Sequence, residues 1–399
     1  MQVAVSAWDS SLLALLRRLG TEGRVRWLDD GFIEFVEGTQ RYPVRPDRRL
    51  PPPLHFLPCL REAPGLSRRD LLSNSRVALA ALRMGPAELD ALDDENALGW
   101  LRRLGVTEAA LRRSWSFIAL TILNVPLELC SAGALVRFFR HLIGHNDTFI
   151  GLPTCGLGDL FAPAAQAWLM ARGGIVATGV AVQSILPAGP DGEDGRRAAG
   201  VRLADGRTLA ARFVVSTVPP AALRGLLPDA WQTAPAFADL SPFVPCPYIS
   251  TCLWFDGKLT DRPFWARLPA PLEFNCDFYD LSNLPPGWPT ERSIIAANII
   301  WSHRAAELSD DQIIAHTRRE LAEYLPAAAT TPLRHAVVNR VPLAIHCPFP
   351  GLERRRPTSA TPFEGLLLAG DWVKTGVPAS MEGACRSGHL AAEVVLAAR

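Results

Sequence analysis

Two residues that could hold a ligand follow a short apolar run near the C-terminus. The run from Gly365 to Ala369 predicts a buried strand, and Gly370 and Asp371 come directly after it. In α/β proteins ligands bind at the carboxyl edge of the sheet, where such an aspartate can accept hydrogen bonds from ribose or ribityl hydroxyls. Because this pattern occurs in many α/β proteins, it predicts a ligand-binding strand end without identifying the ligand.

A helix after this strand end would hold it in place. Ser380 to Ala398 predicts that helix, and small residues give it a face that can lie close to a sheet. These small residues are Gly383, Ala384, Ser387, Gly388, Ala391 and Ala392. The first turn, around Met381 and Glu382, offers unpaired N–H groups and a partial positive charge. That end suits an anion, such as the one a reduced flavin carries near N1 and its adjacent carbonyl.

The longer string LAGDWVKTGVPASMEGACRSG, which ends at Gly388, resembles the closing motif of the phytoene-desaturase branch of flavin amine oxidases. The resemblance implies an FAD cofactor. Four residues match the positions where that family contacts the ribityl chain and the pyrimidine edge of the isoalloxazine: Gly370, Asp371, Met381 and Glu382. Val182 matches the valine that packs on the adenine, and the STVPP stretch from Ser216 matches the family's strand end and proline loop.

Within that branch the chain is most similar to the hydroxysqualene dehydroxylases, also described as squalene-associated FAD-dependent desaturases. Stretches such as SLLALLRRLG, LPPPLHFLP and GLGDLFAPAAQAWLMARGG carry the similarity. It implies a flavin amine oxidase-like α/β fold, an apolar isoprenoid substrate, and reductive dehydroxylation of hydroxysqualene to squalene. The stretch STCLWFDGKLT is also similar to carotenoid desaturases, which run the flavin in the oxidative direction. A catalytically silent remnant that binds isoprenoid or a partner is the third alternative.

The chain departs from that family at its beginning. Such enzymes open with a strand, a GxGxxG turn and a helix that bind the ADP half of FAD. The nearest match, Gly156-Leu157-Gly158, has no third glycine and opens no βαβ unit. We therefore expect the sheet strands 212–217 and 365–370 to lack neighbours and to have bare edges. Three hypotheses explain the missing dinucleotide-binding unit. The start codon was placed too late, a separate chain supplies the unit, or the gene has decayed.

Composition excludes several other functions. Forty-one basic residues face forty acidic ones, a net charge of +1, which disfavours nucleic-acid binding. The eight cysteines form no CxxC pair, and we expect them to be reduced, as in the cytoplasm. His141 and His145 have metal-ligand spacing beside Asp147, but without an HExxH motif we predict no metal site. Eleven tryptophans and the apolar Leu54 to Leu57 stretch leave peripheral membrane contact open.

The coarse pattern predicts a mixed α/β protein with two lobes. Residues 1–150 are interpreted as a substrate-lobe hairpin and helical subdomain, and 151–240 as part of the FAD-binding domain. Residues 241–345 are interpreted as a β-rich substrate lobe, and 346–399 as the C-terminal part of the FAD-binding domain. The helical pattern covers 67–149, the period changes to two in 175–185, and the strand 212–217 is predicted to be buried on both faces.

Overall fold

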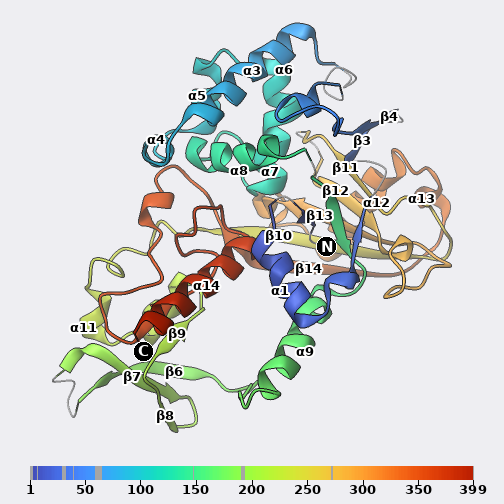
Figure 1. Ribbon diagram of the computed structural model, residues 1–399. Helices are drawn as coiled ribbons and strands as arrows, with labels where there is room; N and C mark the ends of the chain where they lie inside the picture. The colour runs from blue at the N-terminus through green and yellow to red at the C-terminus, as the bar shows by residue number, and fades with distance from the viewer. Residues whose placement is uncertain are drawn as a thin grey trace. The chain divides into compact units, whose positions relative to one another are not determined.

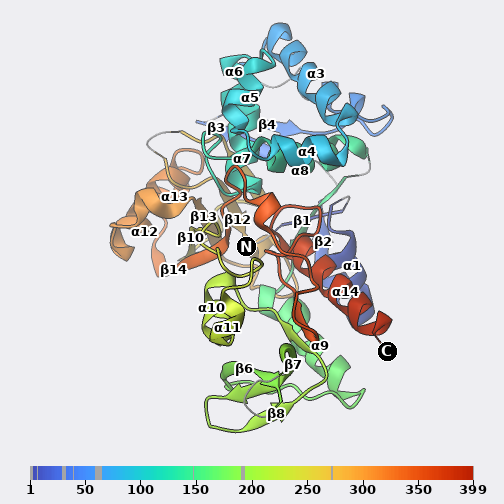
Figure 2. The same ribbon diagram turned by 90° about the vertical axis from the view of Figure 1, so that its left-hand side faces the viewer.

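The computed structural model describes residues 3–6, 8–28, 33–38, 40–58, 65–146, 148–189, 194–270 and 273–398. Contacts within the chain divide it into two compact units, whose elements are labelled in Figures 1 and 2. Unit 1 comprises Met1–Ala165 and Pro245–Pro350, and unit 2 comprises Gln166–Val244 and Gly351–Arg399. Each unit is therefore built from two separate stretches of sequence. The assignment of the four sequence segments to substrate and FAD-binding roles stays a prediction.

Unit 1 contains the helical subdomain that the sequence predicted. Its helices are α3 (Arg68–Arg83), α4 (Pro86–Leu92), α5 (Ala97–Arg103), α6 (Glu108–Ala110), α7 (Ser116–Ile122) and α8 (Ala132–Gly144). Both views show these helices gathered together (Figures 1 and 2). Ser67 and Asp70 form a capping box at the start of α3, and Ser131 accepts a hydrogen bond from the N–H of Ala134 at the start of α8.

The leucine spacing in residues 10–19 predicts a helix, and the extended runs 31–36 and 40–44 joined through Gly38 predict a hairpin; both are present among the described residues. Helix α1 (Ser10–Leu19) buries Leu12, Leu13 and Leu16, and Gly20 ends it with a φ of +72°. Strands β3 (Ile33–Glu37) and β4 (Gln40–Val44) pair antiparallel. The first two residues of the predicted hairpin, 31 and 32, lie outside the described residues.

The main sheet of unit 1 has the order β14-β10-β13-β12-β11-β3-β4 among the described residues. The further strands are β10 (Pro245–Phe255), β11 (Phe264–Arg267), β12 (Asp277–Asp280), β13 (Ile294–Ile300) and β14 (Leu333–His346). All pairs are antiparallel except β11 with β3. A smaller sheet has the order β1-β5-β2, from β1 (Ala4–Val5), β5 (Ile150–Pro153) and β2 (Val25–Trp27). The main sheet carries the polar side chains of unit 1 that are described below as a second candidate site.

The two faces of the main sheet are covered by different elements. One face packs Phe255, Trp265 and Phe278 against Leu321 of α12 (Asp310–Ala322) and Ala328 of α13 (Ala327–Thr330). The spacing of Ser309 and Gln312 predicts a capping box, and the structure has this capping box at the start of helix α12. The second face carries an apolar cluster of buried residues: Phe35, Phe117, Ile150, Leu152, Phe264, Ala266, Tyr279, Leu281, Leu284, Ile294 and Ala296.

Unit 2 contains two small sheets. Strands β6 (Val182–Ala188), β7 (Asp194–Leu203) and β8 (Thr208–Ala210) form an antiparallel sheet, and Gly206 turns between β7 and β8 with a φ of +88°. Strands β9 (Val214–Ser216) and β15 (Leu366–Leu368) form a parallel pair. The helices are α10 (Pro220–Leu226), α11 (Asp229–Gln232) and α14 (Met381–Ala397), while α9 (Leu157–Met170) spans the boundary between the units. Trp231 stacks on Phe363 at 4.1 Å in the core.

Two predictions about unit 2 were wrong. The alternating segment 175–185 is a strand only from Val182 onward, and Ile175 is 93% exposed. The strand at 212–217 is not buried on both faces, because Val215 is 45% exposed. The reason is that β15 is the only strand paired with β9 in the described part of the chain. A two-stranded parallel sheet has too few neighbours to cover its side chains.

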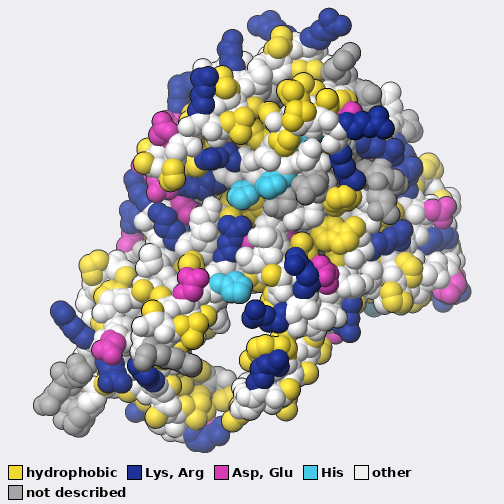
Figure 3. Space-filling view, viewed as in Figure 1, with side chains coloured by type: hydrophobic (Ala, Val, Ile, Leu, Met, Phe, Trp, Pro, Cys, Tyr) yellow, Lys and Arg dark blue, Asp and Glu magenta, His cyan; other side chains and the backbone are white. Residues whose placement is uncertain are grey.

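The distribution of charged side chains and the state of the cysteines agree with the sequence composition. Figure 3 shows basic and acidic side chains interspersed over the visible face, so that face carries no extended field of one sign. The seven cysteines that the structure describes are free thiols, and Cys59 lies outside the described residues. No helix among the described residues is both long and apolar enough to cross a bilayer.

Candidate active site

The end of β15 is fixed by the helix that follows it. Leu366, Leu367 and Leu368 are at most 2% exposed, so the strand is anchored in the core of unit 2. The next residues turn sharply at Gly370, which has a φ of +124° and whose N–H donates to Ser387 Oγ of α14 at 2.7 Å. A Cβ at Gly370 would lie 3.0 Å from the Trp372 ring, so the position requires glycine.

Helix α14 approaches the strand end closely because its inner face is built of small residues. Ser387 and Ala391 are at most 2% exposed, and a Cβ on Gly383 would lie 3.3 Å from the carbonyl oxygen of Pro378. Ser380 caps the helix by accepting a hydrogen bond from the N–H of Gly383 at 3.1 Å. The predicted helix from 380 to 398 is confirmed, and its first turn directs N–H groups out of the helix end.

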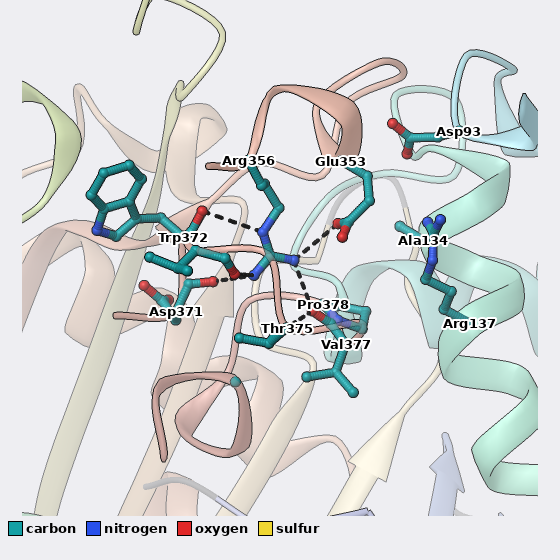
Figure 4. A network of polar contacts seen from close by, with 12 residues as sticks. Asp93, Ala134, Arg137, Glu353, Arg356, Asp371, Trp372, Thr375, Val377 and Pro378 are labelled. Carbon is teal, nitrogen blue, oxygen red and sulfur yellow. Dashed lines mark hydrogen bonds and ion pairs between the residues drawn. The ribbon is translucent and has the colours of Figure 1, made fainter. Parts of the chain in front are cut away.

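Arg356 holds the loop between β15 and α14 in place. Its side chain is 6% exposed, and all five of its N–H groups donate hydrogen bonds. Four acceptors are backbone carbonyls of the loop and the fifth is a carboxylate: Trp372 (3.3 Å), Val377 (2.7 Å), Asp371 (2.5 Å), Val373 (2.6 Å) and Glu353 Oε2 (2.9 Å). Figure 4 shows the guanidinium enclosed by these groups. One buried cation therefore determines the path of the backbone from Asp371 to Val377.

The carboxyl group of Asp371 lies at the start of this loop. Burial raises its pKa above the usual value of an aspartate, and the charge of Arg356 offsets part of that rise. Two buried polar atoms have no hydrogen-bond partner among the described residues. They are Ser216 Oγ, at the end of β9, and Trp372 Nε1, four residues after the end of β15. The strand end thus offers an acceptor, a hydroxyl and an N–H to a polar ligand.

The other predicted contact residues are placed as follows. Met381 and Glu382 form the first turn of α14, so they belong to the same strand-loop-helix segment as Gly370 and Asp371. The carboxylate of Glu382 is fully buried and accepts a hydrogen bond from Arg386 Nε at 2.6 Å. Val182 begins β6, where it pairs with Leu203 and is 40% exposed. The structure groups four of the five residues and places Val182 in a different sheet of unit 2; their contacts with a cofactor stay predictions.

Unit 1 carries a second candidate site, on the second face of its main sheet. Ser250 of β10, Asn298 of β13, and Asp277 and Tyr279 of β12 form a chain of hydrogen bonds across three neighbouring strands; we call these four residues the polar strip. Ser250 Oγ donates to Asn298 Oδ1 at 3.1 Å, and Asn298 Nδ2 donates to Asp277 Oδ1 at 2.7 Å. Tyr279 Oη donates to Asp277 Oδ2 at 2.8 Å.

The polar strip crosses a face that is otherwise apolar. Its neighbours there include the rings of Phe35 and Phe264 and the side chain of Ile294. Ser250 and Asp277 are half-buried, so part of each remains accessible. Burial raises the pKa of Asp277 to about 6, and the hydrogen bonds from Tyr279 and Asn298 lower it by less than burial raises it. Asp277 is therefore a carboxyl group that exchanges its proton near neutral pH.

Sequence reasoning missed Arg356 and Asp277. Arg356 stands in the run Arg354-Arg355-Arg356, and nothing local distinguishes the buried arginine from its exposed neighbours. Asp277 does have a signal, because it precedes the buried residues of a short strand, Asp277–Asp280, at a position that faces an apolar side. A charged residue in phase with the apolar face of a strand is a candidate functional residue.

Comparison with known proteins decides the family. The family of flavin containing amine oxidoreductases matches residues 5–396. The chain belongs to this family. The cofactor of this family is FAD, so the chain is an FAD-dependent oxidoreductase. Asp371, Ser216 and Trp372 fit that cofactor, because a buried acceptor and two orphaned polar atoms at a strand end can bond to its hydroxyls.

Curated relatives of the family are carotenoid enzymes. The chain is 27% identical to a 15-cis-phytoene desaturase of Synechococcus elongatus over 415 aligned positions, which cover 97% of this chain and 83% of the relative. It is 28% identical to the corresponding Capsicum annuum enzyme, covering 96% of this chain and 66% of the relative. A zeta-carotene desaturase of Synechocystis is 24% identical, covering 83% of this chain and 73% of the relative. The chain is thus similar to phytoene and zeta-carotene desaturases along most of its length.

Solved structures confirm the predicted fold. A single mutant of putrescine oxidase superposes with a TM-score of 0.69 at 18% identity, covering 98% of this chain and 86% of that chain. A protoporphyrinogen oxidase from Exiguobacterium gives a TM-score of 0.66 at 13% identity, covering 100% of this chain and 87% of that chain. At such identities the likeness shows the flavin amine oxidase-like fold alone.

Proposed function

We propose that this protein reduces a polyprenoid alcohol, converting hydroxysqualene to squalene by loss of the hydroxyl group. The observation that carries the proposal is the polar strip on the apolar second face of the main sheet. A polyprenoid chain gains free energy from contact with apolar side chains that are only partly buried, and Cys252 and Trp254 of β10 are side chains of this kind on the same face as Ser250. Its single hydroxyl group would be costly to bury unless it found a hydrogen-bonding partner. Asp277 and Ser250 offer such partners.

The reaction sets two demands on the protein. When bound, reduced FAD supplies a hydride to the substrate carbon. The chain's own residues must hold the polyprenoid, exclude water around the reacting carbon, and deliver a proton to the departing oxygen. The apolar cluster on the second face serves the first two demands, and the polar strip offers titratable and hydrogen-bonding groups for the third.

Phytoene desaturation is the second candidate. The relatives named above, phytoene and zeta-carotene desaturases that align along most of this chain, favour it. A desaturase substrate is a hydrocarbon without a hydroxyl group, so it offers nothing that the polar strip could bind by hydrogen bonds. This difference is why we place the alcohol first.

The two candidates are separated by a direct assay. FAD-loaded protein is supplied with hydroxysqualene under reducing conditions, and with phytoene in the presence of a quinone oxidant, and products are identified by mass spectrometry. Squalene formation without phytoene consumption is the expected result. Desaturated carotenoid without squalene would replace the first candidate by the second, and no product from either substrate would favour a catalytically silent isoprenoid-binding protein.

We also propose that FAD binding requires a strand-helix-strand unit from outside residues 1–399. Support comes from β9, whose Val214 N–H donates to Gly365 on the β15 side, so that the N–H of Val215 faces the opposite edge. That edge has no paired strand among the described residues, and Ile175 of the same unit is 93% exposed. Parallel sheets are normally covered and multistranded.

Spectroscopic titration tests this requirement. Residues 1–399 are compared with the same chain fused to, and mixed with, the GxGxxG unit of a phytoene desaturase. Protein-bound flavin absorbance only when the unit is present is the expected result, and Val215→Pro should abolish that gain while leaving the β9 and β15 pairing intact. Stoichiometric FAD binding by residues 1–399 alone would overturn the requirement.

Contact with a membrane surface is proposed for unit 1. Leu54 and Leu57 are 46% and 44% exposed, and helix α3 exposes Leu72 to 70% beside the arginines at its start. Exposed leucines next to arginines suit the surface of an anionic bilayer. Co-sedimentation with anionic liposomes should weaken severalfold in a Leu54→Asp, Leu57→Asp double variant. Unchanged sedimentation would remove this surface from the proposal.

A further inference from the structure

The proposed dehydroxylation needs an acid that the sequence did not identify, and unit 1 contains one that fits. A hydroxyl group leaves readily only when its oxygen is protonated as the bond to carbon breaks. The donor must lie on the face that binds the substrate, hold a proton near neutral pH, and have a fixed orientation. Of the polar strip only Asp277 is an acid with a raised pKa and two fixed hydrogen bonds, and it lies on the face that the proposed function assigns to the substrate.

The orientation of Asp277 is fixed by two neighbours on two strands. Asn298 Nδ2 donates to one carboxyl oxygen at 2.7 Å, and Tyr279 Oη donates to the other at 2.8 Å. Asn298 is itself oriented by the 3.1 Å hydrogen bond from Ser250 Oγ. Each carboxyl oxygen has a further lone-pair direction or proton position available, and the side chain is half-buried, so a substrate hydroxyl can reach it.

We propose that Asp277 is the catalytic residue that protonates the departing hydroxyl group, with Tyr279 and Asn298 as its positioning residues. This inference rests on the proposed function, because it names the acid of that same reaction. The bond between carbon and oxygen breaks, the oxygen takes the proton of the Asp277 carboxyl group, and water leaves. Reduced FAD, when bound, would supply the hydride and both electrons that the carbon gains, so that the reaction balances as substrate alcohol, proton and hydride giving hydrocarbon and water. Asp277 then regains its proton from solvent.

The surroundings of Asp277 keep the pKa of its carboxyl group close to neutral pH. Burial is the largest influence on its pKa, which is raised to about 6. The titratable described groups that face it are Tyr248 of β10 and Cys276 and Tyr279 of β12. Burial raises the pKa of the Cys276 thiol to about 12 and those of both tyrosines well above their usual value. All three therefore stay neutral at pH 7, and only Asp277 exchanges a proton there.

The first test measures the proton itself. Infrared spectra of protein carrying ¹³C-labelled aspartate are recorded from pH 4 to pH 8 with the full protein. Wild type should show a protonated carboxyl band that titrates near pH 6 and that is missing in Asp277→Asn. Tyr279→Phe should move this titration to higher pH, because the Tyr279 hydrogen bond favours the charged form. A band unchanged by Asp277→Asn would overturn the assignment, whatever the substrate proves to be.

The second test measures turnover of hydroxysqualene by protein that is fused to the GxGxxG unit described above and loaded with FAD. Asp277→Asn should lower kcat by about 10² to 10⁴ with flavin content unchanged, and Asp277→Glu should restore part of it. Tyr279→Phe should move the alkaline limb of the kcat profile, where Asp277 loses its proton, to higher pH. Asp261→Asn, an exposed aspartate outside the site, is the control. Wild-type turnover with an unimpaired Asp277→Asn variant would overturn this inference alone. Absence of wild-type squalene formation would overturn the proposed function, and with it the role of Asp277.

Discussion

In the loop that follows β15, one guanidinium satisfies backbone carbonyls, whereas in the polar strip side chains of three strands satisfy one another. The loop is local in sequence, with Arg356 acting on residues 371 to 377. The strip joins residues up to 48 positions apart. A local motif can therefore be read from sequence, while a site assembled by strand pairing becomes visible only when the register is known.

Removing the cation at the centre of the loop should have the largest effect. Arg356→Met removes five hydrogen bonds, four to carbonyls of the loop and one to the Glu353 carboxylate, which should cost about 3–5 kcal/mol in the free energy of unfolding. Thermal denaturation should show the loss together with loss of bound flavin. Arg355→Met is the matched control, since Arg355 is half-exposed and pairs with Asp239 on the surface. Equal losses in both variants would contradict the central role of Arg356.

The acid of the polar strip should make stability depend on pH. The pKa of Asp277 is about 6 in the folded state, against 3.8 as its ordinary value. Between these values the folded state binds more protons than the unfolded state, so this group's contribution to stability is present below about pH 4 and is lost as pH rises through 6. The loss should approach about 3 kcal/mol at most. Denaturant unfolding should show this slope in wild type, and Asp277→Asn should lack it.

Backbone conformation in the loop is tested at Gly370. Gly370→Ala places a Cβ 3.0 Å from the Trp372 ring at a φ of +124°, which should cost about 2 kcal/mol and weaken flavin binding. Gly388→Ala is the control, because a Cβ there meets nothing within 4 Å and α14 should gain about 0.5–1 kcal/mol. A stable, flavin-binding Gly370→Ala variant would show that the loop tolerates another path.

A substitution of Ser250, at the end of the polar strip, should have the smallest effect on the free energy of unfolding. Ser250→Ala removes one hydrogen bond to Asn298, and unfolding should cost about 1 kcal/mol less. The adjacent Thr251 points to the opposite face with a buried hydroxyl that has no partner in the described part of the chain, so Thr251→Val should be neutral or stabilising. Denaturant midpoints of the two variants compare the two faces of β10 directly. Wild-type stability in Ser250→Ala would show that this hydrogen bond contributes no stability.

These differences also explain what could be predicted from sequence. Helix α1, the capping box of α12, strands β10, β13 and β14, and the segment from Gly365 to α14 follow from periodicity and local signals. The unpaired edge of β9 was expected from the absence of a GxGxxG turn. The exposure of Val215 was not, because coverage of a strand depends on the elements that lie beside it. The role of Arg356 could not be predicted, because tertiary packing decides which of the three consecutive arginines, 354 to 356, is buried.

The unpaired side of β9 also bears on how this polypeptide behaves in solution. A strand edge with an exposed Val215 is a template on which another chain can add a strand, and edges of this kind promote aggregation and domain swapping. Residues 1–399 produced alone should then self-associate with rising concentration, and light scattering would follow this. Solubility would become a sensitive measure of whether the sheet of unit 2 is complete.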